Sequence, residues 1–125
     1  ITTVREIRAW NGATPLPRTR EFVRGVINLR GTIVPIFDLR ARFGDGLTET
    51  TKNHVVVVMS VGEKWVGVLV DAVSDILTIP RNDVHTVPEG DSMDAEFLSG
   101  IVPHDEKMVG LIDLQAIVSG VSMDA

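Results

Sequence analysis

Short apolar runs, separated by glycine, proline and polar turns, make up most of the chain. Val55–Met59 is apolar at every position, which is typical of a strand covered on both faces. A turn at 62–64 follows, and Trp65–Val70 runs back as a second apolar segment. These two runs predict a β-hairpin, and Val73–Ile79 predicts a further strand that ends at Pro80.

A second hairpin is predicted nearer the start of the chain. Val26–Leu29 and Thr32–Phe37 are rich in branched residues and flank residues 30–31. Asp38 is then a suitable N-cap for a short helix over 39–43. Two strands and one short helix are therefore expected in this region.

The remaining predicted elements are also short. A strand-like run at 3–10 opens the chain, and a strand at 108–112 leads into a short helix at 113–120. Many short strands with only two short helices indicate an all-β fold.

The chain also repeats itself. Two segments recur at an offset of 75 positions, and a third recurs at an offset of 69. The matching pairs are Glu21–Ile27 with Glu96–Val102, Pro35–Leu39 with Gly110–Leu114, and Val4–Ile7 with Val73–Ile76. Two related units predict two small β-barrels packed together, each needing about five strands to remove its open edges. The seam between two such units is a place for partners to bind.

The repeat sets the expected domain organisation. We expect one domain over residues 1–125, with a first subdomain at about 1–54 plus the helix at 113–120, and a second subdomain at about 55–112. The second unit has an apolar strand ahead of its repeat segment, whereas only three residues precede Val4. One strand of the first unit is therefore expected to be absent from this sequence.

Charge divides the chain unevenly. The net charge is −5, yet residues 1–42 hold eight arginines against three acidic residues, whereas the remainder holds four basic and fourteen acidic residues. A basic first half is compatible with nucleic-acid binding, but these arginines are scattered through apolar segments without lysine clusters. A nucleic-acid binder requires a continuous basic groove; otherwise the uneven charge orients the protein against a charged partner.

The sequence lacks the features of disulfide-bonded, membrane-spanning and secreted proteins. The chain has no cysteine, which excludes disulfides and thiolate metal sites and favours a reducing compartment. No apolar run approaches the roughly 18 residues that a membrane helix needs, and no signal peptide opens the chain. We therefore expect a cytoplasmic protein without direct membrane insertion.

Candidate catalytic chemistry is sparse. The histidines His54, His85 and His104 show no metal-ligand spacing, and the serines lie in no nucleophile motif. We therefore expect no catalytic residues, no metal and no cofactor. A small acid/base enzyme using Asp71 and Asp75 is the alternative from another class, and it requires these carboxylates to converge in a pocket.

Glu6 and Arg30 are charged residues embedded in apolar strand segments. One interpretation of Arg30 is a local ion pair that ties a strand end. The other is a partner surface, where arginine is enriched because its planar guanidinium both pairs and stacks. The sequence leaves both interpretations open.

Four segments that span essentially the whole chain match a known pattern. They are Val4–Arg8, Phe22–Arg40, Val66–Leu77 and Phe97–Gly100. The combination of Asn28–Gly31 with Pro35 and Asp38 is the most specific part of the match. The chain thus resembles the CheW family of bacterial chemotaxis coupling proteins, whose members normally begin with one more strand ahead of the segment at Val4.

The resemblance implies a fold and a function. The family fold is two SH3-like five-stranded β-barrels with a groove between them. CheW-like proteins are non-enzymatic scaffolds that bridge a CheA-type histidine kinase and the cytoplasmic tip of chemoreceptors in membrane-associated arrays. A CheW-like domain of a CheV-type or CheA-type protein is the alternative, and Asn28–Gly31 favours the coupling-protein branch over the kinase branch.

The resemblance also implies site residues. Receptor contact in the family uses the groove and nearby strands, and kinase contact uses apolar ends of the barrels. No nucleic-acid partner is implied. The implied partner-binding residues are Val4, Glu6, Gly25, Asn28, Arg30, Val55, Val56 and Ile76.

Overall fold

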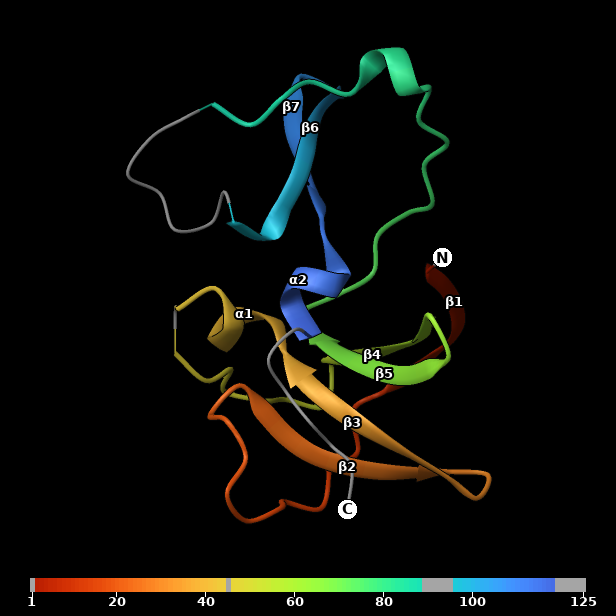
Figure 1. Ribbon diagram of the computed structural model, residues 1–125, viewed down its shortest axis with the longest axis vertical. Coiled ribbons are helices and arrows are strands. Elements are labelled where there is room, and N and C mark those ends of the chain that lie inside the picture. The colour runs from red at the N-terminus through yellow and green to blue at the C-terminus, as the bar shows by residue number, and fades with distance from the viewer. Residues whose placement is uncertain (1, 45, 89–95, 119–125) are drawn as a thin grey trace. The chain divides into compact units, whose positions relative to one another are not determined.

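The chain divides into two compact units. The computed structural model describes residues 2–44, 46–88 and 96–118. Unit 1 comprises residues 1–73 and 118–125, and unit 2 comprises residues 74–117. Figure 1 shows the elements of both units.

Unit 1 is built on a five-stranded sheet in which strands distant in sequence are neighbours. The order across the sheet is β1-β4-β5-β3-β2, and only β3 and β5 pair in parallel. The strands are β1 (Thr2–Ala9), β2 (Val23–Leu29), β3 (Thr32–Asp38), β4 (Val55–Val61) and β5 (Lys64–Val70).

Both predicted hairpins are confirmed. Strands β2 and β3 pair antiparallel around residues 30–31, where Leu29 lies opposite Thr32. Strands β4 and β5 pair antiparallel around a turn that begins at Gly62, whose φ of 63° favours glycine. The predicted opening strand at 3–10 is β1.

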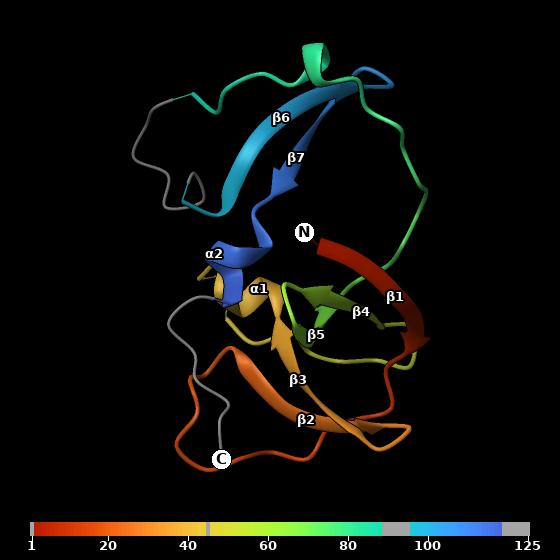
Figure 2. The same cartoon turned by 45° about the vertical axis from the view of Figure 1, so that its right-hand side comes forward.

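The sheet of unit 1 curls so that the chain leaving one edge reaches the other edge. Beyond the end of β1, Thr14 pairs with Val26 of β2 through two backbone hydrogen bonds of 2.9 Å. The Trp10 amide also donates to the His54 carbonyl at 3.0 Å. The strong curvature visible in Figure 2 is the geometry expected of a small barrel.

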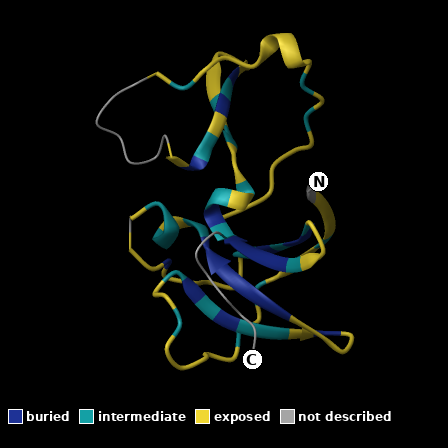
Figure 3. Cartoon of the chain, viewed as in Figure 1, coloured by how far each residue is buried: buried dark blue, intermediate teal, exposed yellow. Residues whose placement is uncertain are grey.

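The core of unit 1 lies within this curled sheet. Strand β4 is buried at Val58–Ser60, whereas Val55 and Val57 stay half-buried, so the prediction of a strand covered on both faces holds for only part of it. Figure 3 shows the buried residues concentrated on the strands of this sheet. The main cluster comprises Leu29, Val34, Ile36, Val56, Val58 and Leu69.

Helix α1 (Leu39–Arg42) follows β3 directly, as predicted. The Asp38 carboxylate accepts a hydrogen bond from the Ala41 amide at 3.2 Å and caps the helix N-terminus. Gly44, with a φ of 87°, follows the end of the helix.

The division into units differs from the one that the sequence suggests. The sequence places the β4–β5 hairpin in the second subdomain, but β4 pairs with β1 and β5 pairs with β3. The division therefore falls after Val73 rather than near residue 54. The helix expected at 113–120 is α2 (Leu114–Val118), which lies almost wholly in unit 2, and its last two expected residues are outside the described residues.

Unit 1 is not short of a strand. It holds five paired strands because the β4–β5 hairpin, which belongs to the second sequence repeat, pairs with strands of the first repeat. The described residues of unit 2 form one two-stranded sheet.

Unit 2 contains β6 (Leu98–His104) paired antiparallel with β7 (Lys107–Ile112). A single 3-10 turn, η1 (Arg81–Asp83), precedes them. The predicted strand at Val73–Ile79 is irregular in the structure and pairs with no other described strand. Its branched residues favour a strand, but a strand forms only where a neighbour completes its hydrogen bonds.

The internal repeat extends to the backbone hydrogen bonds. In each unit a residue of the segment ahead of the first repeated strand forms a β-bridge with that strand. The amide of the aspartate before the helix also donates a hydrogen bond to the carbonyl of the residue that precedes the strand. Both repeated strands also carry a register shift next to a glycine. The matching features are Thr14–Val26 with His85–Ile101, Asp38–Phe22 with Asp113–Phe97, and Gly25 with Gly100.

Candidate partner-binding surface

The turn between β2 and β3 fixes the position of Arg30. Both central residues have positive φ, 51° at Arg30 and 92° at Gly31, as a type I′ hairpin turn requires. The Asn28 side-chain oxygen accepts a hydrogen bond from the Gly31 amide at 2.8 Å. Asn28 therefore stabilises the turn, and the Arg30 side chain is 70% exposed.

Glu6 of β1 joins two arginines. Its Oε1 atom accepts a hydrogen bond from Nη1 of Arg30 at 3.1 Å, and its Oε2 atom contacts Nη1 of Arg8 at 3.4 Å. The ion-pair interpretation of Arg30 is confirmed, and the pair links one edge strand of the sheet to the turn that follows the other edge strand. Two guanidinium groups share one carboxylate, so this cluster keeps a net positive charge.

Exposed apolar side chains accompany this charged cluster on the same elements. Val4 and Ile7 of β1 and Ile33 of β3 are all exposed. Val4 and Ile7 pair with Met59 and Val57, whereas Glu6 pairs with Val58, so the two apolar residues lie on the opposite face of β1 from Glu6. We call Glu6, Arg8 and Arg30 the β1–turn surface. An exposed arginine is typical of partner-binding surfaces.

Three of the implied site residues are buried or half-buried. Val56 is 2% exposed within the core cluster, so its side chain is not available to a partner. Gly25 is buried with a φ of 138°, and a Cβ atom there would lie 2.2 Å from the Thr14 carbonyl oxygen. Val55 is half-buried and pairs with Ala9. These residues hold β2 and β4 in place beneath the surface.

Ile76 belongs to unit 2. Its side chain is 89% exposed, and its amide donates to the Asp75 carboxylate at 2.8 Å. The structure brings Glu6 and Arg30 into contact within unit 1, and Ile76 is an exposed apolar residue of the other unit.

A buried carboxylate anchors the loop that leads into β4. Asp38 is fully buried and accepts hydrogen bonds from the Thr48 amide at 2.8 Å, the Thr48 hydroxyl at 2.7 Å and Nε of Arg24 at 3.0 Å. Burial opposes ionisation of this group, but the hydrogen bonds from Thr48, Ala41 and Arg24 outweigh it and hold the pKa of Asp38 below its usual value. The Arg24 guanidinium also donates to the Thr48 carbonyl.

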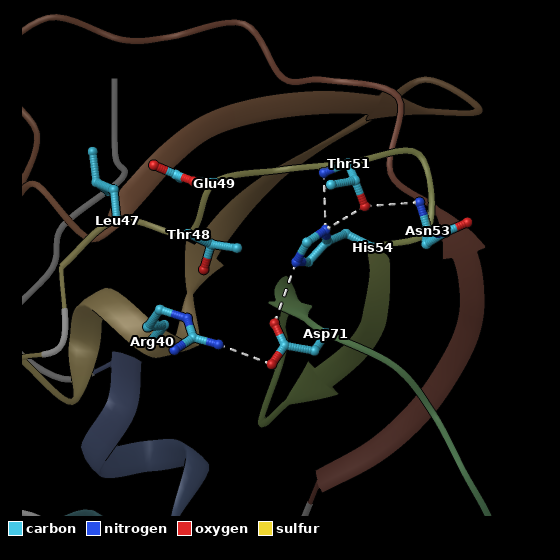
Figure 4. Close-up of a pocket in the computed structure, with 8 residues that line it drawn as sticks. All are labelled: Arg40, Leu47, Thr48, Glu49, Thr51, Asn53, His54 and Asp71. Atoms are coloured by element: carbon cyan, nitrogen blue, oxygen red, sulfur yellow. Dashed lines mark hydrogen bonds and ion pairs between the residues drawn. The ribbon is translucent and has the colours of Figure 1, made fainter.

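A polar cleft of about 560 Å³ lies beside this anchor, as Figure 4 shows. The Asp71 carboxylate bridges Nη2 of Arg40 at 2.9 Å and Nε2 of His54 at 3.2 Å. The Thr51 amide donates to Nδ1 of His54 at 2.9 Å, so in the neutral ring the proton is on Nε2 and points to Asp71. Sequence spacing gives no signal for this cluster, because its members come from separate segments.

The acid/base hypothesis lacks the convergence that it requires. Asp71 is paired with Arg40 and His54 in unit 1, whereas Asp75 is in unit 2 and accepts a hydrogen bond from the amide of the next residue. Each carboxylate has its own ion-pair or turn role. Among the described residues, no group of three or more histidine, cysteine or acidic residues is placed to hold a metal ion.

Six of the nine arginines contact a carboxylate or an aromatic ring. Arg8, Arg24, Arg30 and Arg40 each contact a carboxylate. Two others lie over aromatic rings: the Arg5 guanidinium is 5.8 Å from the centre of the Trp65 ring, and that of Arg42 is 4.4 Å from the centre of the Phe22 ring. A nucleic-acid interface is therefore not supported.

No helix in the described part of the chain is long and apolar enough to cross a membrane.

Comparison with known proteins decides the family. The family model of the CheW-like domain matches residues 1–122. The chain belongs to the CheW-like domain family. The sequence-based resemblance to CheW is thereby confirmed.

Individual CheW proteins match nearly the whole chain. A probable chemotaxis protein CheW of Rhizobium etli is 44% identical over 100% of this chain and 81% of its own length. The chemotaxis protein CheW of Rhizobium meliloti is 42% identical over 94% of this chain and 76% of its own length. Both relatives carry the name CheW, and neither carries the name CheV or CheA.

A solved structure agrees with the fold. The scaffolding protein TtCheW from Thermoanaerobacter tengcongensis matches with a TM-score of 0.84 and 34% identity, covering 96% of this chain and 79% of that chain. The predicted all-β fold with short helices is thus confirmed, and the described residues form one five-stranded and one two-stranded sheet rather than two five-stranded ones.

Proposed function

We propose that this CheW-like chain is a non-enzymatic scaffold that couples chemoreceptors to a CheA-type histidine kinase. The support is the family match over residues 1–122 together with relatives that are chemotaxis and scaffolding proteins. The arrangement of Asp71 and Asp75 adds to it, because these two carboxylates have separate partners.

The single observation that carries the receptor contact is the exposed Glu6–Arg30 pair. A partner helix can pair its carboxylates with the excess positive charge of this cluster, and Val4 and Ile7 are exposed apolar residues on the other face of β1. Asn28 and Gly25 contribute by shaping the hairpin that carries Arg30, and Val55 and Val56 contribute by supporting β4.

In this proposal the two partners use different parts of the chain. The β1–turn surface of unit 1 contacts the cytoplasmic tip of the receptor, with Ile76 of unit 2 as a further exposed apolar contact. The kinase binds elsewhere, at apolar ends of the fold. The scaffold is thereby recruited to membrane-associated receptor arrays through its partners.

A co-sedimentation assay tests the proposal. Membranes carrying receptor fragments are mixed with the chain and a CheA-type kinase, and both the recruited kinase and its autophosphorylation rate are measured. We expect the chain to raise both quantities above those of receptor and kinase without it. Failure of the chain to bind either partner overturns the scaffold function.

A further inference from the structure

Asn11 and Gly12 lie just beyond the end of β1, in the segment that leads toward β2. Both residues are exposed, and Gly12 has a φ of 86° with nothing within 4 Å of the place that a Cβ atom would take. Among the described residues, none forms a hydrogen bond with the Asn11 side chain or with the Gly12 amide. A solvated carboxamide therefore stands next to a solvated backbone amide that no side chain crowds.

The other three asparagines of the chain lack this combination, although all three are exposed. The amide that follows Asn53 donates to the Thr51 carbonyl at 3.1 Å. The amide that follows Asn82 donates to the Pro80 carbonyl at 3.0 Å. Asn28 uses its side-chain oxygen in the β2–β3 turn, and a buried leucine follows it within the strand. The fold thus restrains the reacting groups at these three positions and leaves those at Asn11 free.

We propose that Asn11 is a site of spontaneous deamidation that converts it into aspartate and isoaspartate. The backbone nitrogen of Gly12 attacks Cγ of Asn11, so an N–Cγ bond forms and the Cγ–Nδ2 bond breaks. The leaving nitrogen takes the Gly12 amide proton and departs as ammonia, which leaves a cyclic succinimide. Glycine favours this closure because it has no Cβ atom beside the attacking nitrogen.

Water then opens the succinimide in one of two ways. Attack at Cγ returns the ordinary backbone and gives aspartate. Attack at the backbone carbonyl carbon gives isoaspartate, in which the main chain runs through the former side chain and gains one carbon atom. Both products carry a carboxylate in place of the neutral carboxamide, and neither step needs an oxidant or a reductant.

The position of Asn11 makes the isoaspartate product consequential. On one side of it, the Trp10 amide donates to the His54 carbonyl at 3.0 Å, and the Trp10 side chain packs against the core. On the other side, Thr14 and Val26 are joined by two backbone hydrogen bonds of 2.9 Å. Only residues 11–13 connect these two anchors, so an added backbone atom strains the bridge that closes the curled sheet of unit 1. Aspartate changes the charge without changing this connection.

A comparison of the folded and unfolded chain tests the reaction. The 125-residue chain is incubated at neutral pH in buffer and in guanidinium chloride, and peptide mapping by mass spectrometry follows deamidation at each asparagine. In the folded chain we expect Asn11 to react about tenfold faster or more than the other asparagines. Unfolding should change the rate at Asn11 by less than about threefold but accelerate the reaction at Asn53 and Asn82, because their following amides are released. Slowing of Asn11 by folding beyond this range, or a rate no higher than that of Asn53, overturns the proposal.

Two substitutions separate the reaction from its effect on the sheet. Asn11→Gln lengthens the side chain and disfavours the succinimide ring, so after ageing we expect no methyl label from an isoaspartyl methyltransferase in this peptide, in contrast to wild type. Asn11→Asp, freshly prepared, carries the added charge on an ordinary backbone. We expect amide hydrogen exchange at Thr14 and Val26 to be about tenfold faster in the purified isoaspartyl form than in fresh wild type, and unchanged in Asn11→Asp. Equal exchange in all three forms overturns the effect on the sheet, and labelling of aged Asn11→Gln in this peptide overturns the assignment to Asn11.

Discussion

Glu6 and Arg30 form an ion pair of 3.1 Å between the first strand and the turn that follows the second strand. Because the Arg30 side chain is mostly exposed, the pair is a surface interaction in high dielectric. It therefore positions Arg30 for a partner more than it stabilises the fold.

A double-mutant cycle measures the strength of this pair. We expect Glu6→Gln, Arg30→Gln and the double variant to give a coupling free energy below about 1 kcal/mol, decreasing as salt is added. Urea unfolding followed by tryptophan fluorescence is suitable, because both tryptophans, Trp10 and Trp65, pack against the core of unit 1. A coupling well above 2 kcal/mol that is insensitive to salt would show a structural role instead.

Asp38 gives unit 1 a defined response to acid. Its pKa in the folded protein lies below the value of about 4 for an unfolded chain. Ionised Asp38 therefore stabilises the fold above about pH 4, and this contribution is lost as the pH falls through the folded-state pKa. We expect Asp38→Asn to lower the free energy of unfolding by roughly 3 kcal/mol at pH 7, with the difference from wild type shrinking below pH 4. Parallel pH profiles of the two proteins would contradict this role.

Thr48 tests the hydrogen bonds to this carboxylate separately. Its buried hydroxyl donates to Asp38 at 2.7 Å. We expect Thr48→Val to cost about 1 to 3 kcal/mol of stability and to raise the pKa of Asp38, because one donor to the carboxylate is lost. Acid titration of the unfolding free energy shows the shift, and a midpoint equal to that of wild type counts against it.

Gly25 allows the segment between β1 and β2 to approach the backbone of β2 closely. Alanine there would place Cβ 2.2 Å from a carbonyl oxygen and strain a backbone with a φ of 138°. We expect Gly25→Ala to destabilise unit 1 by about 3 kcal/mol or more. The control is Gly31→Ala, where φ is 92° but nothing lies within 4 Å, and about 1 kcal/mol is expected. Equal losses in the two variants would remove the argument from close approach.

Local signals in the sequence predict the hairpins, the Asp38 cap and the repeat. Each depends on residues close together along the chain: a turn at 30–31, an aspartate ahead of a helix, or matching segments. The Glu6 and Arg30 positions are also recognisable, because a charge inside an apolar strand needs a partner or an interface.

Local sequence patterns do not predict which distant segments pair as strands. Local patterns do not show that β4 pairs with β1 or that β5 pairs with β3, so they do not show that the β4–β5 hairpin joins the strands of the first repeat. Val55 and Val56 are indistinguishable by residue type, and only the strand register places Val56 in the core. The contact of Asp71 with Arg40 and His54 likewise depends on the tertiary fold.

The most direct test of the proposed coupling function is receptor co-sedimentation of Arg30→Glu beside Arg81→Glu. Both variants reverse the charge of an exposed arginine, and Arg81 lies in η1 of unit 2, outside the β1–turn surface. We expect Arg30→Glu to weaken receptor binding about tenfold or more while its unfolding curve stays close to that of wild type, and Arg81→Glu to bind normally. Wild-type recruitment and kinase activation by Arg30→Glu would contradict the placement of the receptor contact at Arg30.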